Sequence, residues 1–131
     1  MGEKVLVDAL INDTVNLVKK LDELSDPPTF VAWYYYDDAD EWRLLLAGPS
    51  IDPLLQKQEP IAYGKVIDAL SKTAPSALSV SDLKLVPTSY SLLQALKFLI
   101  STGPQGMARA HFRESTLNGI FVKEVLIMRS A

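Results

Sequence analysis

The chain has 131 residues, of which 48% are hydrophobic and 22% charged, a composition typical of one globular domain with its own core. It contains no cysteine, which excludes disulfide bonds and thiolate metal sites. Its net charge of −3 argues against general nucleic-acid binding, because that binding depends on neutralising phosphates. We therefore expect a single domain, residues 1–131, with no nucleic-acid partner.

The charge is unevenly distributed along the chain. Residues 1–60 hold five basic and twelve acidic residues, whereas residues 97–131 hold five basic and two acidic residues. The basic last third leaves room for a small anion site. No apolar run reaches the roughly 20 residues that span a bilayer, and the first residues lack the pattern of a secretory signal. We expect a cytoplasmic protein with no membrane partner.

The first predicted elements are a helix and a β-hairpin. Apolar residues recur at three- and four-residue steps over residues 4–24, as one face of a helix requires, and Asp26-Pro27-Pro28 ends that helix. Residues 29–36 and 41–47 form two β-rich runs around an acidic four-residue turn. Pairing Tyr36 with Glu41 sorts the two strands into faces. The face expected in the core holds Val31, Trp33, Tyr35, Trp42, Leu44 and Leu46, and the opposite face holds Phe30, Ala32, Tyr34, Tyr36 and Leu45.

The middle of the chain alternates between helices and strands. Residues 48–58 are expected to be a loop, and residues 60–72 a helix with Pro60 in its first turn. A short strand follows over residues 82–86, and then a helix capped by Thr88 or Ser89 that ends at Gly103. We expect this strand, this helix and the next strand to form one parallel crossover.

The last hairpin carries the strongest local signal. Asn118-Gly119 is the preferred pair for a two-residue type I′ turn, because both of its central residues need positive φ. That turn fixes a register in which opposite charges face each other across the strands, and such pairs stabilise a sheet. The expected pairs are Leu117 with Ile120, Phe112 with Val125, Ala110 with Ile127, Glu114 with Lys123 and Arg113 with Glu124. The fold class is therefore α+β, with the order α-β-β-α-β-α-β-β and a largely antiparallel five-stranded sheet that packs helices on at least one face.

The sheet is unusually apolar on both faces. If Ala110, Phe112, Phe121, Val125 and Ile127 face the helices, strict alternation leaves several large apolar residues on the outer face. One-sided antiparallel sheets usually alternate more cleanly, so we expect something to cover this face. One of the chain's own helices, a second copy of the chain or a different protein would each provide that cover. The predicted interface residues are Tyr34, Tyr36, Ile120, Val122, Leu126 and Met128.

Two polar clusters are candidates for binding. Arg109, His111 and Arg113 share one face of a strand, where they would bind a phosphate or carboxylate or else form a polar stripe beside an interface. The acidic turn residues offer oxygen ligands to a divalent cation, but aspartate is also common in turns for its local hydrogen bonds. These weak metal candidates are Asp37, Asp38 and Asp40. We expect a solvated turn there and no cofactor.

No motif in the chain specifies a reaction. The favoured interpretation is a non-enzymatic protein-interaction domain that acts through the apolar sheet face as a homodimer, for example an adaptor, an inhibitor or an immunity-type partner. The alternative is a small anion-binding protein or enzyme that uses Arg109, His111 and Arg113 at the sheet surface.

Overall fold

The computed structural model describes residues 6, 8–25, 27–103, 106–117 and 119–131. Four α-helices, one 3-10 turn and five strands lie in these ranges. In chain order they are α1 (Asp8–Glu23), β1 (Phe30–Tyr36), β2 (Glu41–Ala47), α2 (Asp52–Lys57), α3 (Glu59–Ser71), the 3-10 turn Val80–Asp82, β3 (Leu83–Leu85), α4 (Ser91–Leu96), β4 (Ala110–Leu117) and β5 (Ile120–Ser130). The α+β fold class expected from the sequence is confirmed.

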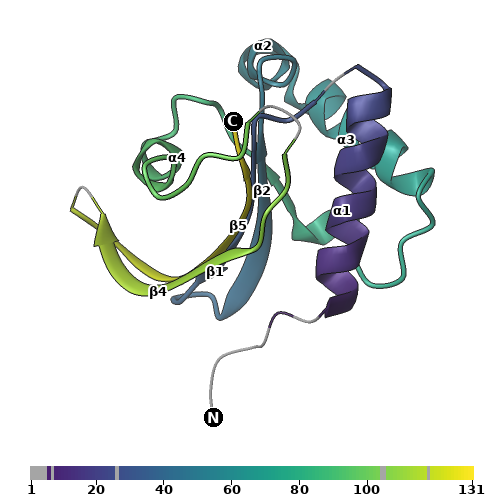
Figure 1. Cartoon of the computed structure of the whole chain (residues 1–131). Coiled ribbons are helices and arrows are strands. Elements are labelled where there is room, and N and C mark those ends of the chain that lie inside the picture. The colour runs from purple at the N-terminus through teal and green to yellow at the C-terminus, as the bar shows by residue number, and fades with distance from the viewer. Residues whose placement is uncertain (1–5, 7, 26, 104–105, 118) are drawn as a thin grey trace.

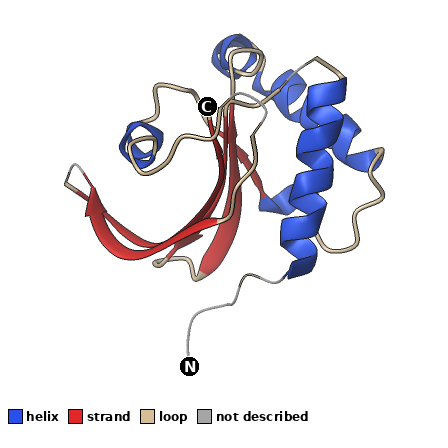
Figure 2. Ribbon diagram, in the orientation of Figure 1, coloured by secondary structure: helices blue, strands red, loops and turns tan. Residues whose placement is uncertain are grey.

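The domain has three layers. The strands form one curved sheet; α1 and α3 lie on one side of it, and α4 lies in the hollow of the other side (Figure 1, Figure 2). The strand order is β3-β2-β1-β5-β4, with every neighbouring pair antiparallel except β2 and β3. Among the described residues no helix combines the length and the apolarity needed to cross a membrane.

Both predicted hairpins form in the predicted register. Tyr36 pairs with Glu41 in the first hairpin, and Leu117 pairs with Ile120 in the second. The remaining pairs follow from these, except that the second ladder is interrupted at Glu114, whose φ is +43°. Gly119 has the positive φ, +79°, that the predicted turn needs, while Asn118 lies outside the described residues.

The two sheet faces form two separate cores. The α1 and α3 face packs the aromatic slab of the first hairpin, including Trp33, Tyr35 and Trp42, against both helices. The α4 face packs Phe30, Ala32 and Leu45 against the leucines of α4. These leucines are Leu92, Leu93 and Leu96. A helix of the same chain therefore covers the outer face, which is one of the alternatives that the sequence left open.

The predicted face assignment of the last hairpin is wrong for residues 125–128, whereas Ile120 and Val122 pack on the same side as Tyr34, as predicted. Leu126 and Met128 pack with Trp33 in the α1 and α3 core, whereas Val125 and Ile127 pack in the α4 core. The cause is the pairing of β5 with β1, which sets Leu126 opposite Trp33. Each turn fixes the register inside its own hairpin, but no local signal fixes the register between hairpins, and a shift of one residue exchanges the faces.

Strict alternation also fails near the tip of the last hairpin. Val122 and Val125 are an odd number of positions apart, yet both are fully buried in the α4 core. Across from them, Phe112 and Leu117 likewise both pack against that core. The break coincides with Glu114, whose φ is +43° and which is missing from the ladder between the pairs Arg113 with Glu124 and Ser115 with Val122. Phe121, expected to face the helices, is 56% exposed.

Three further expectations about local structure are wrong. The predicted loop 48–58 contains α2, because Asp52 and Pro53 start a short helix there. The hydroxyl of Thr88 donates to Asp52 instead of capping α4, whose N-cap residue is Tyr90 without a side-chain cap. The parallel pair joins β2 to β3 through α2 and α3, while β3 and β4 lie at opposite edges of the sheet.

A buried hydrogen bond joins α1 to the sheet. The Trp33 indole Nε1 donates to Thr14 Oγ1 at 2.9 Å, and the Thr14 hydroxyl in turn donates to the Leu10 carbonyl at 2.7 Å. Both Trp33 and Thr14 are fully buried.

We expect Thr14→Val to lower the free energy of unfolding by about 1–2 kcal/mol, because it keeps the side-chain shape and leaves a buried indole donor unpaired. Urea denaturation followed by tryptophan fluorescence measures this loss. Thr14→Ser, which keeps the hydroxyl acceptor for the Trp33 indole but removes a methyl group, is the control. A Thr14→Val variant as stable as the wild type would show that the hydrogen bond contributes nothing.

A tyrosine-lined pocket as the candidate functional site

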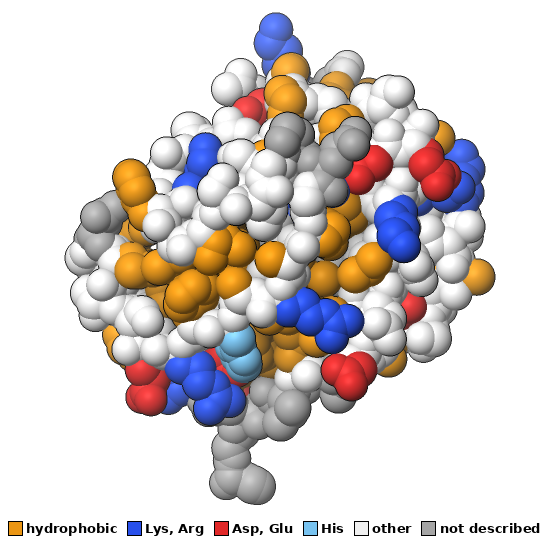
Figure 3. Space-filling view, viewed as in Figure 1, with side chains coloured by type: hydrophobic (Ala, Val, Ile, Leu, Met, Phe, Trp, Pro, Cys, Tyr) orange, Lys and Arg blue, Asp and Glu red, His pale blue; other side chains and the backbone are white. Residues whose placement is uncertain are grey.

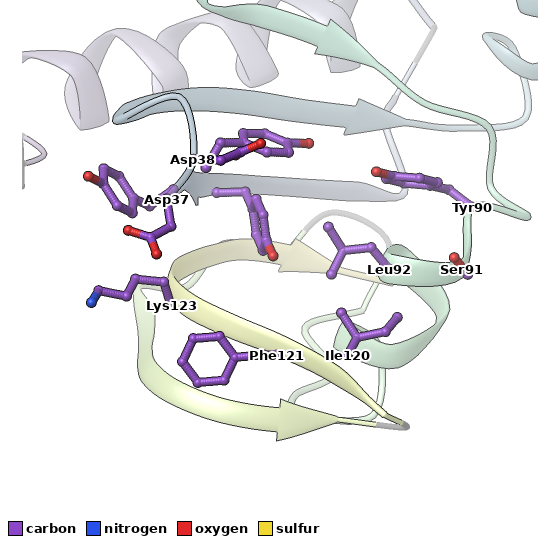
Figure 4. A pocket seen from close by; sticks show the side chains of 11 residues that line it. Asp37, Asp38, Tyr90, Ser91, Leu92, Ile120, Phe121 and Lys123 are labelled. Atoms are coloured by element: carbon purple, nitrogen blue, oxygen red, sulfur yellow. The ribbon is translucent and has the colours of Figure 1, made fainter.

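A pocket of about 460 Å³ opens where three segments distant in sequence meet. They are the end of β1 with its acidic turn, residues 34–38, the start of α4, residues 90–92, and the start of β5. The β5 side chains are Ile120, Phe121 and Lys123 (Figure 4). The volume lies within the range of ordinary ligand pockets.

Three of the four tyrosines that line the pocket, Tyr34, Tyr36 and Tyr90, contact one another. The rings of Tyr34 and Tyr36 meet edge to face with their centroids 4.8 Å apart, which is a favourable aromatic geometry. Tyr36 and Tyr90 are linked by a hydrogen bond between their side chains. Tyr34 is buried, whereas Tyr36 and Tyr90 are half-buried. The group therefore presents ring faces and hydroxyl groups together.

All three phenols are held in their neutral form. Burial raises the pKa of Tyr34, and the nearby groups Tyr36, Tyr90 and Asp38 raise it further. Burial likewise raises the pKa of Tyr36 and the pKa of Tyr90, despite opposing contributions from Arg43 and Lys84 respectively. At neutral pH these hydroxyls donate and accept hydrogen bonds, and none of them is a ready general base.

Charged groups surround the tyrosines. Lys84 on β3 donates a hydrogen bond from Nζ to the Tyr36 hydroxyl at 3.1 Å, and its Nζ lies 4.7 Å from the centroid of that ring. Asp37 and Asp38 are exposed at the rim of the pocket. The lining of the pocket therefore contains two carboxylates and one ammonium, that of Lys123.

The acidic turn is held by its own hydrogen bonds. The Tyr35 hydroxyl donates to Asp40, whose φ is +50°, and the Asp40 amide donates to the Asp37 carbonyl at 3.3 Å. Asp40 thus fixes the conformation of the turn, while Asp37 and Asp38 border the pocket. No group of three or more histidine, aspartate or glutamate side chains within the described ranges is arranged to hold a metal ion.

The six predicted interface residues separate into two groups. Tyr34, Tyr36 and Ile120 line the pocket. The other three, Val122, Leu126 and Met128, are buried in the cores of the chain itself, with exposed fractions of 0%, 6% and 0%. A second copy is not needed to cover the sheet, and the homodimer stays a prediction.

Two of the three predicted anion-binding residues, His111 and Arg113, lie on β4 and contact a carboxylate, whereas Arg109 directly precedes the strand. Glu124, which is 7% exposed, accepts from Arg113 at 3.2 Å and lies 2.5 Å from Nε2 of His111. Arg109 donates to Asn12 on α1 at 3.4 Å. The buried carboxylate neutralises part of the positive charge that a free phosphate would need.

Sequence reasoning missed Tyr90, Leu92 and the exposed position of Phe121. Tyr90 precedes a short helix, and no local pattern connects it to β1, more than fifty residues earlier. Tyr34, Tyr36 and Tyr90 come together through the packing of α4 into the curved sheet.

Comparison of the chain with protein-family models, curated proteins and solved structures finds no match.

Proposed function

We propose that this protein is a non-enzymatic interaction domain that binds an exposed segment of another protein in the tyrosine-lined pocket. A lysine or arginine side chain of that segment is seated among the three tyrosines. The observation that carries this proposal is the graded exposure of the pocket. Tyr34 and Leu92 are buried at its base, Tyr36 and Tyr90 are half-buried, and Phe121 is exposed at its rim.

The shape favours a protein segment over a small free ligand. Small ligands are usually enclosed over most of their surface, whereas this pocket is bordered by exposed residues at Asp37, Asp38 and Phe121. One side chain of a larger partner fits such a site, and the rest of the partner then covers the rim. Tyrosine and phenylalanine are also enriched where protein interfaces gain most of their binding energy.

The chemistry favours a cationic side chain. Cations are attracted to the faces of tyrosine rings, and the carboxylates of Asp37 and Asp38 border the pocket. Lys84 already places an ammonium beside the Tyr36 hydroxyl, so this group of rings accommodates a positive charge. The excess of acidic residues in the first 60 positions adds an attraction that speeds encounter with basic partners.

The neutral phenols support binding rather than catalysis. A general base works best when its pKa lies near the operating pH, and burial moves the pKa of Tyr34 and of Tyr90 away from neutrality. The alternative function, an anion-binding protein or enzyme built on Arg109, His111 and Arg113, has weaker support because Glu124 lies against two of these groups.

Selection of peptides against the purified protein tests the proposal. We expect a display library of random twelve-residue peptides to yield binders rich in arginine or lysine. Their affinity should fall at least about tenfold with Tyr90→Ala and with Phe121→Ala, as for residues at the centre of an interface. Calorimetry with synthetic copies of the selected peptides measures the change.

Phe98→Ala provides the matched control. Phe98 is 82% exposed and lies outside the pocket lining, so its removal takes away a comparable apolar surface without touching the site. Selected basic peptides that bind Tyr90→Ala as tightly as the wild type would overturn the proposal, and so would a set of Tyr90-dependent binders that carry acidic residues in place of basic ones. Circular dichroism of each variant checks that the fold is intact.

A further inference from the structure

The second feature of interest is the free edge of the sheet at β4. In the described part of the chain, β4 pairs only with β5, so its outer backbone groups face away from the sheet. Unpaired edges of this kind accept an extended segment of another chain. The positive φ of Glu114 interrupts the edge, which leaves residues 110–113 as its regular part.

The two faces of this edge differ in chemistry. On the α4 side, Ala110 and Phe112 are half-buried beside Leu99 and Ile100, and they all pack against the α4 core. Figure 3 shows apolar side chains gathered between α4 and β4, above the single histidine. On the other side lie the basic residues Arg109, His111 and Arg113, all of them exposed.

The basic side has an excess of positive charge. Its two arginines, Arg109 and Arg113, have one buried carboxylate near them, that of Glu124, which contacts Arg113 and His111. Arg109 donates to the neutral side-chain amide oxygen of Asn12 at 3.4 Å. An added strand would place alternate side chains beside these cations and the others against the apolar side, because strand side chains alternate between faces.

We propose that the β4 edge binds an extended protein segment that alternates acidic and apolar residues, and that adds to the sheet as a sixth strand. Main-chain hydrogen bonds to β4 supply affinity, and the alternating side chains supply specificity. The acidic residues pair with Arg109 and Arg113, and the apolar residues extend the surface formed by Ala110 and Phe112. This site lies apart from the tyrosine-lined pocket and does not depend on the function proposed for it.

A designed peptide tests this inference directly. The probe is a capped seven-residue peptide of alternating glutamate and valine, and its control replaces each glutamate by lysine. We expect the acidic peptide to bind, to slow amide hydrogen exchange over residues 110–113, and to bind Arg109→Glu at least about tenfold more weakly. Lys19→Glu, which makes the same charge change at an exposed position on α1, should leave the affinity within about twofold.

Several results would overturn the inference. They are equal binding of the lysine peptide, unchanged amide exchange in β4, and equal effects of Arg109→Glu and Lys19→Glu. If Arg109→Glu fails to fold, Arg113→Gln, which removes one charge without reversing it, replaces it as the test variant. Tyr90→Ala should leave binding of the acidic peptide unchanged, so failure here and failure at the pocket are distinguishable.

Discussion

Asp22→Ala is expected to lower the free energy of unfolding by about 3–5 kcal/mol, because it leaves a buried guanidinium without its counter-ion. Arg129 is 1% exposed, and its NH1 and NH2 each donate to Asp22 at 2.9 Å. The same side chain donates to the carbonyls of Pro28 and Gly106. Arg129, on β5, thereby links the last strand to the end of α1, to the residues before β1 and to the residues before β4.

A double-mutant cycle separates the pair from its surroundings. Arg129→Met removes the charge and keeps a long apolar side chain, so Asp22→Ala combined with Arg129→Met should lose less stability than the sum of the two single changes. Urea denaturation at neutral pH provides each free energy. Lys20→Ala is the control, since Lys20 forms an exposed ion pair with Glu23 on the same helix and should cost under about 1 kcal/mol. Additive losses in the cycle would show that the two side chains do not act as a pair.

Asp13→Ala is expected to lower the free energy of unfolding by about 3 kcal/mol at pH 7, because a charged acceptor of several backbone amides is lost. Asp13 is 6% exposed, and its Oδ2 accepts from the amides of Ser76, Ala77 and Leu78 at 3.0, 2.7 and 2.9 Å. This carboxylate fastens the connector before β3 to α1, so the β3 edge of the sheet should loosen first.

The same carboxylate gives the stability a defined pH dependence. Burial by itself would raise the pKa of Asp13, but the hydrogen bonds from Leu78, Ala77 and Ser76 outweigh it and lower the pKa below the ordinary 3.8. Its stabilising contribution is therefore complete above about pH 4, and it is lost as the pH falls through the lowered folded-state pKa. The difference in unfolding free energy between wild type and Asp13→Ala should shrink steadily below pH 4. A difference that stays constant down to pH 2 would contradict this assignment.

The sequence predicted local structure well and long-range structure poorly. Both hairpins have short turns whose residues specify the register, so Tyr36 with Glu41 and Leu117 with Ile120 pair as expected. The contact between hairpins has no such signal. β5 pairs with β1 so that Leu126 lies opposite Trp33, and this register exchanges the faces of residues 125–128 relative to the prediction.

The candidate site shows the same limit. The sequence indicates Tyr34, Tyr36 and Ile120 as interface residues because they are apolar or aromatic on a face expected to be outside, and all three line the pocket. It does not indicate Tyr90, because the position of Tyr90 depends on where α4 packs. The apolar outer face indicates that something covers the sheet, and the six-residue helix α4 of the same chain packs against it.

The methyl resonances of Leu92 and Ile120 provide the most direct test of the proposed pocket, because both side chains line it. Acetyl-arginine amide is the probe, and acetyl-glutamate amide is the matched control of opposite charge. We expect the arginine compound to shift both methyl signals saturably, with a dissociation constant in the millimolar range typical of one isolated side chain. Unchanged methyl signals, or equal shifts with the glutamate compound, would contradict the proposal that this pocket receives a basic side chain.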